Sequence, residues 1–165
     1  MTPFSTDIAT PKSQPMESSM QKTEDALQSL YTRLVDSADG YRQALESSSD
    51  HTYSHIFRDM IARRERNAGE LRGYLADRGV EMDDDGSLLA AAHRAFLQLK
   101  SMLMDTDEAV LDEIVRGERE LLDAYDAAIT PAGATTPEFE FLTQQYESLR
   151  EKVTELEAMK RRAAA

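Results

Sequence analysis

Residues 107–125 read DEAVLDEIVRGERELLDAY, and this stretch shows the clearest periodicity in the chain. Its large apolar residues recur at intervals of three, four or seven: Leu111, Ile114, Leu121 and Tyr125. Side chains at this spacing share one face of an α-helix. Thr106 can cap the start of the helix, and Pro131 with Gly133 ends the pattern near residue 130. The stretch therefore predicts an amphipathic helix with one face in a core.

The same spacing appears in three further long segments, on both sides of this one. They cover about residues 22–48, about residues 51–78, and the stretch from Thr136 and Pro137 to about residue 160. The joint between the first two segments is too short for anything except an antiparallel hairpin. Matched helices of this length predict an all-α bundle.

A connection of about 27 residues joins the two hairpins and contains a shorter helical pattern over about residues 87–104. Two antiparallel hairpins joined by one long crossover form the ferritin-like four-helix bundle, whereas a simple up-down bundle has short loops throughout. The predicted domain spans residues 22–160. It is flanked by a disordered tail at residues 1–21, which is rich in Pro, Ser and Thr, and by a short C-terminal tail at residues 161–165.

The amino-acid composition limits the classes of partner that this domain can bind. Nineteen Lys and Arg against thirty-one Asp and Glu give a formal net charge of −12, which opposes binding to nucleic acid or to an anionic membrane. The chain has no cysteine, and therefore no disulfide or thiolate zinc site. Because neither an export signal nor a long apolar run is present, we expect a cytoplasmic protein.

A few polar residues lie within the apolar stripes. Arg64 and Glu118 are near the midpoints of their helices, so they should reach the same layer of the bundle. We expect a buried, hydrogen-bonded ion pair, extended by Gln145 or by the hydroxyl of Tyr41, because an unpaired buried charge costs several kcal/mol. The alternative is that one or both charges reach the rim of the bundle.

Metal-ligand patterns are weak in this sequence. The chain has three histidines, His51, His55 and His93, and none of them follows a glutamate by three residues, as the Glu-x-x-His motif of di-iron bundles requires. The acidic run at residues 81–86 lacks the glutamate that closes an EF-hand loop. We therefore expect no metal and no other cofactor.

Several short runs are similar to a known family: GYRQA at residues 40–44, Arg64 with Glu70 and Leu71, GSL at residues 86–88 leading to His93 and Arg94, and DEAVL at residues 107–111 leading to Arg116, Gly117, Glu118 and Tyr125. They resemble a bacterial family of ferritin-like four-helix-bundle proteins catalogued as a domain of unknown function, over about residues 24–160. The resemblance implies the ferritin-like fold, together with a metal-binding or stress-related role among relatives. The family's pattern has acidic residues where this chain has Val115 and Arg119, and a histidine near Lys152 and Val153.

Three hypotheses follow. The first is a non-enzymatic, ferritin-like bundle with a structural or interaction role, forming a homo-oligomer through an apolar helix face or binding a protein partner. The second is a metal-binding or ferroxidase-type protein that holds iron or zinc with Glu70, His93 and Glu118. The third is an adaptor whose acidic surface recruits basic partners.

Overall fold

The computed structural model describes residues 14–47, 52–82, 107–132 and 139–165. The regular elements in these residues are α-helices, and no strand occurs among them. The helices are α1 (Gln14–Ser47), α2 (Ser54–Ala76), α4 (Asp107–Ala132) and α5 (Glu140–Ala163). The prediction of an all-α protein is confirmed for the described part of the chain.

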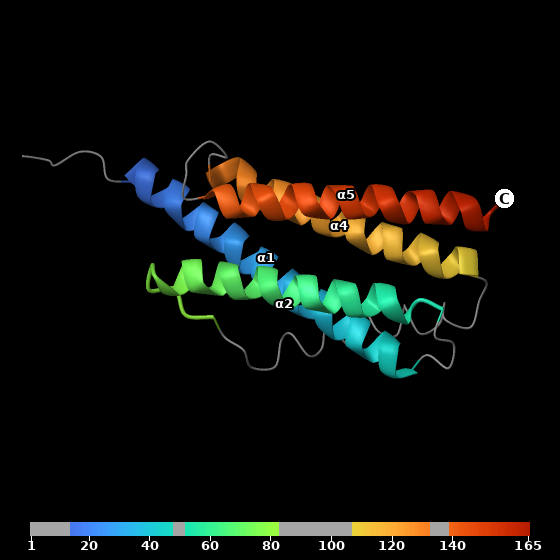
Figure 1. Cartoon of the computed structure of the whole chain (residues 1–165). Helices are drawn as coiled ribbons and strands as arrows, with labels where there is room; N and C mark the ends of the chain where they lie inside the picture. The colour runs from blue at the N-terminus through green and yellow to red at the C-terminus, as the bar shows by residue number, and fades with distance from the viewer. Residues whose placement is uncertain (1–13, 48–51, 83–106, 133–138) are drawn as a thin grey trace, which may run out of the picture.

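The helices form two antiparallel pairs that pack together as a four-helix bundle (Figure 1). One pair is α1 with α2, the other is α4 with α5, and α1 packs against α4. Helices α2 and α4 run in the same direction, as the colour gradient of Figure 1 shows. The shorter helix predicted at about residues 87–104 lies outside the described residues.

The first helix begins earlier than the sequence pattern predicted. Residues 14–21, assigned above to the tail, belong to α1, and residues 1–13 lie outside the described part. Pro15 is compatible with this start, because the first turn of a helix has no internal partner for its amides. Between Pro15 and Gly40 the helix contains neither proline nor glycine, and the hydroxyl of Thr23 donates to the carbonyl of Ser19 (3.1 Å) within the early turns.

The last helix likewise runs further than predicted. It continues to Ala163, so the tail assigned to residues 161–165 is helical for most of its length. The last turn carries Lys160, Arg161 and Arg162, whose positive charges suit the negative end of a helix dipole.

Helix α2 is followed by a turn that contains Gly79. Gly79 has a φ of 74°, a left-handed conformation that glycine adopts without a Cβ clash. The amide of Val80 reaches back to the carbonyl of Leu75 (3.0 Å), which satisfies a carbonyl at the helix end. Residues 48–51, which join α1 to α2, lie outside the described residues.

The core consists of two apolar clusters, one toward each end of the bundle. Cluster I contains Leu27, Leu30, Tyr31, Leu34, Ala68, Leu71, Leu75, Leu121, Tyr125, Ala128, Phe139, Leu142, Leu149 and Val153. Cluster II contains Tyr41, Ala44, Tyr53, Ile56, Phe57, Met60, Val110, Leu111, Ile114, Val115 and Leu156. The apolar face predicted for residues 107–125, with Leu111, Ile114, Leu121 and Tyr125, lies in these clusters, and Leu45 of α1 is partly buried beside cluster II. Each large side chain buried in this way contributes about 1.5–3 kcal/mol.

The described helices were also compared with the requirements of a membrane span. None of them has a stretch that is long and apolar enough to cross a membrane.

Candidate functional site

A layer of polar side chains separates the two apolar clusters. On α2, Arg64 lies one turn from Met60 of cluster II and one turn from Ala68 of cluster I. Glu118 occupies the corresponding place on α4, between Val115 and Leu121. The arginine and glutamate side chains are 1% and 2% exposed, and Arg64 Nη2 pairs with Glu118 Oε2. Both charges are therefore inside the bundle and not at its rim.

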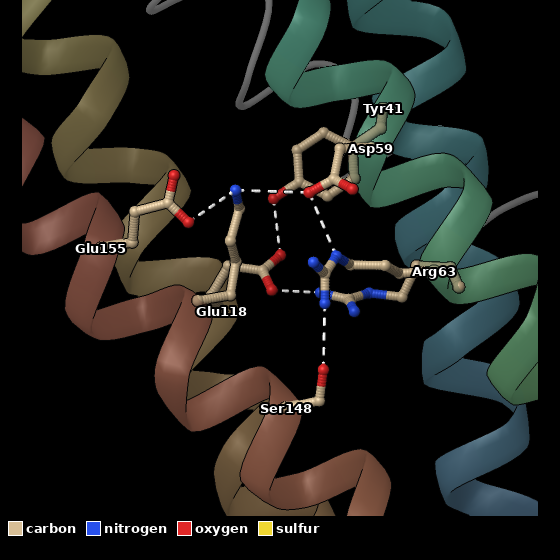
Figure 2. A network of polar contacts seen from close by, with 8 residues as sticks. Tyr41, Asp59, Arg63, Glu118, Ser148 and Glu155 are labelled. Carbon is tan, nitrogen blue, oxygen red and sulfur yellow. Dashed lines mark hydrogen bonds and ion pairs between the residues drawn. The ribbon is translucent and has the colours of Figure 1, made fainter.

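Helix α1 completes this layer. The hydroxyl of Tyr41 donates to Glu118 Oε1 (2.6 Å), so each carboxylate oxygen has its own donor (Figure 2). Arg64 also uses its Nε, which donates to the hydroxyl oxygen of Ser37 (3.2 Å). Three helices thus share one hydrogen-bonded ion pair, and this bonding offsets part of the cost of removing two charges from water.

The protonation of this layer follows from its surroundings. Burial raises the pKa of Tyr41 well above its ordinary value of 10.0, and the negative charge of Glu118 raises it further. Burial lowers the pKa of Arg64, but the nearby Glu118 more than offsets this and leaves that pKa above its ordinary value. At neutral pH the layer therefore contains a guanidinium cation and a neutral phenol that serves as a donor.

A second set of polar side chains lies next to the ion pair. Tyr125 donates its hydroxyl hydrogen to Gln145 Oε1 (2.9 Å) and accepts from Asn67 Nδ2 (3.0 Å). Gln145 Nε2 in turn donates to Glu70 Oε2 (2.6 Å). Of the two side chains expected to extend the ion pair, Tyr41 contacts Glu118, whereas Gln145 bonds to Tyr125 and Glu70.

Tyr125 is a member of this network that the sequence pattern did not identify. Its ring fills cluster I as predicted, but its hydroxyl joins the polar chain. Burial raises its pKa to about 12. Asn67 was also missed, although it follows Arg64 by three residues and so shares its helix face.

Helices α2 and α5 are joined by polar side chains along their seam. Arg63 Nε donates to Asp59 Oδ2 (3.1 Å), and Arg63 Nη1 donates to the Ser148 hydroxyl (3.0 Å). Lys152 Nζ lies 3.3 Å from Asp59 Oδ2 and 2.9 Å from Glu155 Oε2. Figure 2 shows Asp59 and Arg63 on α2 facing Ser148 and Glu155 on α5. Burial raises the pKa of Asp59, but Arg63 and Lys152 outweigh this and lower it overall.

A groove of roughly 280 Å³ opens along this seam and reaches the polar interior. Its lining includes Arg63, Arg66 and Asn67 from α2 and Phe141, Gln145 and Leu149 from α5. Arg64 and Glu70 also contribute to the lining, so the groove connects the surface with both polar layers.

The side chains considered as weak metal ligands either bond to other side chains or lie away from the central layer or outside the described residues. Glu118 is bonded to Arg64 and Tyr41, and Glu70 is bonded to Gln145 in the next layer. His93 and His51 are outside the described residues, and His55 is exposed near the start of α2. Within the described ranges, no three His, Asp or Glu side chains group as metal ligands.

The described part of the chain thus defines an all-α bundle protein with a buried ion pair at its centre. Residues 22–131 match the sequence model of a family described as Domain of unknown function (DUF2383), and the chain belongs to this family. No curated protein and no solved structure matches the chain significantly.

Proposed function

We propose that this protein is a non-enzymatic helical bundle of the ferritin-like type, with a structural or interaction role and a charge pair in place of a central metal. The observation that carries the proposal is the Arg64–Glu118 pair, completed by the Tyr41 hydroxyl. A guanidinium in contact with Glu118 repels a second cation and occupies the carboxylate that a metal would need.

The direction of the helices supports the ferritin-like part of the proposal. Because α2 and α4 run the same way, the end of α2 and the start of α4 lie at opposite ends of the bundle. A bundle whose second and third long helices are parallel is typical of ferritin-like folds, whereas up-down bundles alternate direction at every connection.

The metal proposal can be tested by elemental analysis of protein purified without chelator, followed by thermal melts with and without Fe²⁺ or Zn²⁺. We expect no stoichiometric metal and no rise in melting temperature. A ligand that binds only the folded state, at 100 times its Kd, would stabilise it by about 2.7 kcal/mol. The alternative, an iron or zinc protein using Glu70, His93 and Glu118, predicts one or two metals per chain and a higher melting temperature.

Two variants make this test specific. Glu118→Gln removes the central carboxylate, and Glu120→Gln makes the same change on the outside of α4, where the side chain is exposed. Metal that is lost in Glu118→Gln and kept in Glu120→Gln would overturn our proposal and establish the alternative. Metal lost equally from both variants would indicate binding by the acidic surface alone.

We further propose that the interaction partner includes a second copy of this chain. Among the described residues, Met20 is the large hydrophobic side chain that is exposed, so the described surface does not offer the broad apolar face expected for an oligomer. A groove of roughly 400 Å³ between α1 and α4 offers charges of both signs instead, with Arg33 on one wall and Glu120 and Asp123 on the other. Such a surface is self-complementary, because a two-fold axis can set Arg33 of each copy against acidic residues of the other.

Sedimentation equilibrium at low and high salt tests this pairing. We expect a dimer at low salt that Arg33→Glu weakens at least ten-fold, while Arg150→Glu on the outer face of α5 leaves the association within two-fold of wild type. A monomer at every concentration would overturn the proposed self-association and would favour the adaptor hypothesis, in which acidic surfaces recruit basic partners.

A further inference from the structure

The groove between α2 and α5 differs in charge from the chain as a whole. The molecule has a net charge of −12, yet Arg63, Arg64 and Arg66 all line this groove. Arg64 is neutralised by Glu118 in the interior, and Arg63 is paired with Asp59, so among the described residues Arg66 is the groove arginine without an ion pair. Arg63 and Arg66 are three residues apart on α2, so they face the groove from one side of the helix.

Arg63 and Arg66 both have N–H groups that can donate to a ligand. Arg63 uses Nε for Asp59 and Nη1 for Ser148, which fixes the guanidinium and leaves Nη2 without a partner among the described residues. Arg66 is exposed, and no hydrogen bond or ion pair joins it to the rest of the described chain. A guanidinium fork matches the two oxygens of a carboxylate, and an ion bound this way gains two parallel hydrogen bonds.

The remaining lining restricts the ligand further. The partly buried ring of Phe141 supplies apolar surface beside the arginines, and Leu149 adds the small part of its side chain that cluster I leaves exposed. An apolar surface suits a carbon skeleton and not a bare inorganic ion. Glu70 lies four residues beyond Arg66 and seven beyond Arg63, or about 6 Å and about 10 Å along the helix axis at 1.5 Å per residue, and its Oε2 accepts from Gln145. Its negative charge disfavours a second anionic group at that end of the ligand.

From these contacts we infer that the groove between α2 and α5 binds a small organic monocarboxylate. The carboxylate pairs with Arg66 and with Nη2 of Arg63, and the apolar body lies on Phe141 and Leu149. The groove of roughly 280 Å³ limits the ligand to a small molecule. Arg64 of the central ion pair lines the same groove, but the proposed carboxylate contacts do not use it. The proposed binding does not depend on the structural or interaction role proposed above.

The probes for a test are hexanoate and phenylacetate, each compared with its neutral amide, and inorganic phosphate as an anion without an apolar body. Binding to the full ¹⁵N-labelled chain is followed by NMR chemical-shift changes during titration. We expect saturable binding of at least one carboxylate, with the largest changes at groove residues. We expect the matching amide and phosphate to bind at least ten-fold more weakly.

Two arginine variants on α2 provide the control. Arg66→Gln removes the unpaired guanidinium from the groove, whereas Arg58→Gln removes the same charge from an exposed position outside the groove lining. We expect Arg66→Gln to weaken carboxylate binding at least ten-fold and Arg58→Gln to change it less than two-fold. Equal weakening by both variants, equal binding of amide and acid, or no saturable binding of either carboxylate would overturn the proposal.

Discussion

Arg64 and Glu118 each depend on the other, because the side chains on either side of them along their helices belong to apolar clusters. Removing one partner of such a pair leaves a buried charge uncompensated, which costs about 3–5 kcal/mol, whereas replacing both by apolar residues is often nearly neutral. The pair is therefore best judged by a double-mutant cycle and not by a single substitution.

We predict that Glu118→Leu lowers the free energy of unfolding by about 3–5 kcal/mol, because it leaves the guanidinium of Arg64 unpaired inside the bundle. Adding Arg64→Met should recover at least half of that loss. Urea unfolding of the two single variants and the double variant measures this. The exposed pair of Arg119 and Glu157 is the comparison, where Glu157→Gln should cost about 1 kcal/mol or less.

If the double variant were as unstable as Glu118→Leu, the cost would come from lost packing or from the hydroxyl of Tyr41, which loses its acceptor in both variants. That result would contradict the ion pair as the main interaction of this layer.

Tyr41 and Tyr125, the buried tyrosines of the polar network, predict a loss of stability at alkaline pH. Burial raises the pKa of Tyr125 to about 12 and that of Tyr41 well above 10.0. Above pH 10 the unfolded chain releases phenolic protons that the folded chain retains, so stability falls as pH rises. We expect the free energy of unfolding to change little from these groups below pH 10 and to fall between pH 10 and 12.

Urea unfolding at closely spaced pH values measures that slope. The variant Tyr41→Phe with Tyr125→Phe should be less stable at neutral pH, since Glu118 and Gln145 lose a donor, and it should lose less stability above pH 10 than wild type. The same slope in both proteins would show that other groups cause the alkaline loss.

At the scale of an element, α2 gives a matched pair of glycine substitutions with opposite signs. Gly79 has a φ of 74°, a conformation that costs an L-residue about 1–2 kcal/mol, so Gly79→Ala should destabilise by about 1 kcal/mol. Gly73 lies inside α2, and an added Cβ there meets nothing within 4 Å. Gly73→Ala should stabilise by about 0.5–1 kcal/mol.

Thermal and urea unfolding of the two glycine variants measure whether each substitution raises or lowers the free energy of unfolding. A stabilised Gly79→Ala would mean that the end of α2 does not need its left-handed residue. A destabilised Gly73→Ala would mean that this face of α2 contacts another part of the protein.

The helices differ in how far their sequences predict them. Periodicity placed the core faces correctly, since a residue such as Leu71 or Leu149 is buried whichever helix packs on it. The predicted start of α1 was wrong. The Ser and Pro content before residue 22 resembles that of a disordered tail, but a single Pro in the first turn does not prevent a helix.

The polar contacts were predictable only in part. Arg64 and Glu118 could be matched from sequence because both lie at helix midpoints on an apolar face. The contacts of Arg63 with Ser148 and of Asp59 with Lys152 could not, because they depend on the rotation and offset of α2 against α5. A helical wheel fixes the face of a residue but not its partner on another helix.

At the scale of the whole molecule, the polar layer divides the core into two parts of unequal size. Cluster I receives buried side chains from all four helices, whereas α5 supplies only Leu156 to the buried part of cluster II. Regions with fewer buried apolar contacts open at lower free energy than the rest of a protein. The two ends of the bundle should therefore differ in local stability.

We predict that native-state hydrogen exchange shows this difference within single helices. In α4, amides of residues 121–128 should exchange with a higher opening free energy than those of residues 110–115. The variant Arg64→Met with Glu118→Leu should narrow this difference, because it joins the two clusters through apolar contacts. Exchange measured by mass spectrometry on short peptides tests both statements, and the opposite order in wild type would contradict the two-cluster description.

The position of the charges also limits how the helices can slide past one another. A slip of α2 by one turn moves it about 5.4 Å along its axis and would bring Met60 or Ala68 opposite Glu118. Both charges would then be buried alone, while the apolar side chains of α2 would still meet apolar neighbours. Apolar packing alone would tolerate a misaligned bundle, but the two unpaired charges raise its free energy by several kcal/mol. One alignment of the four helices is therefore favoured over those shifted by a turn.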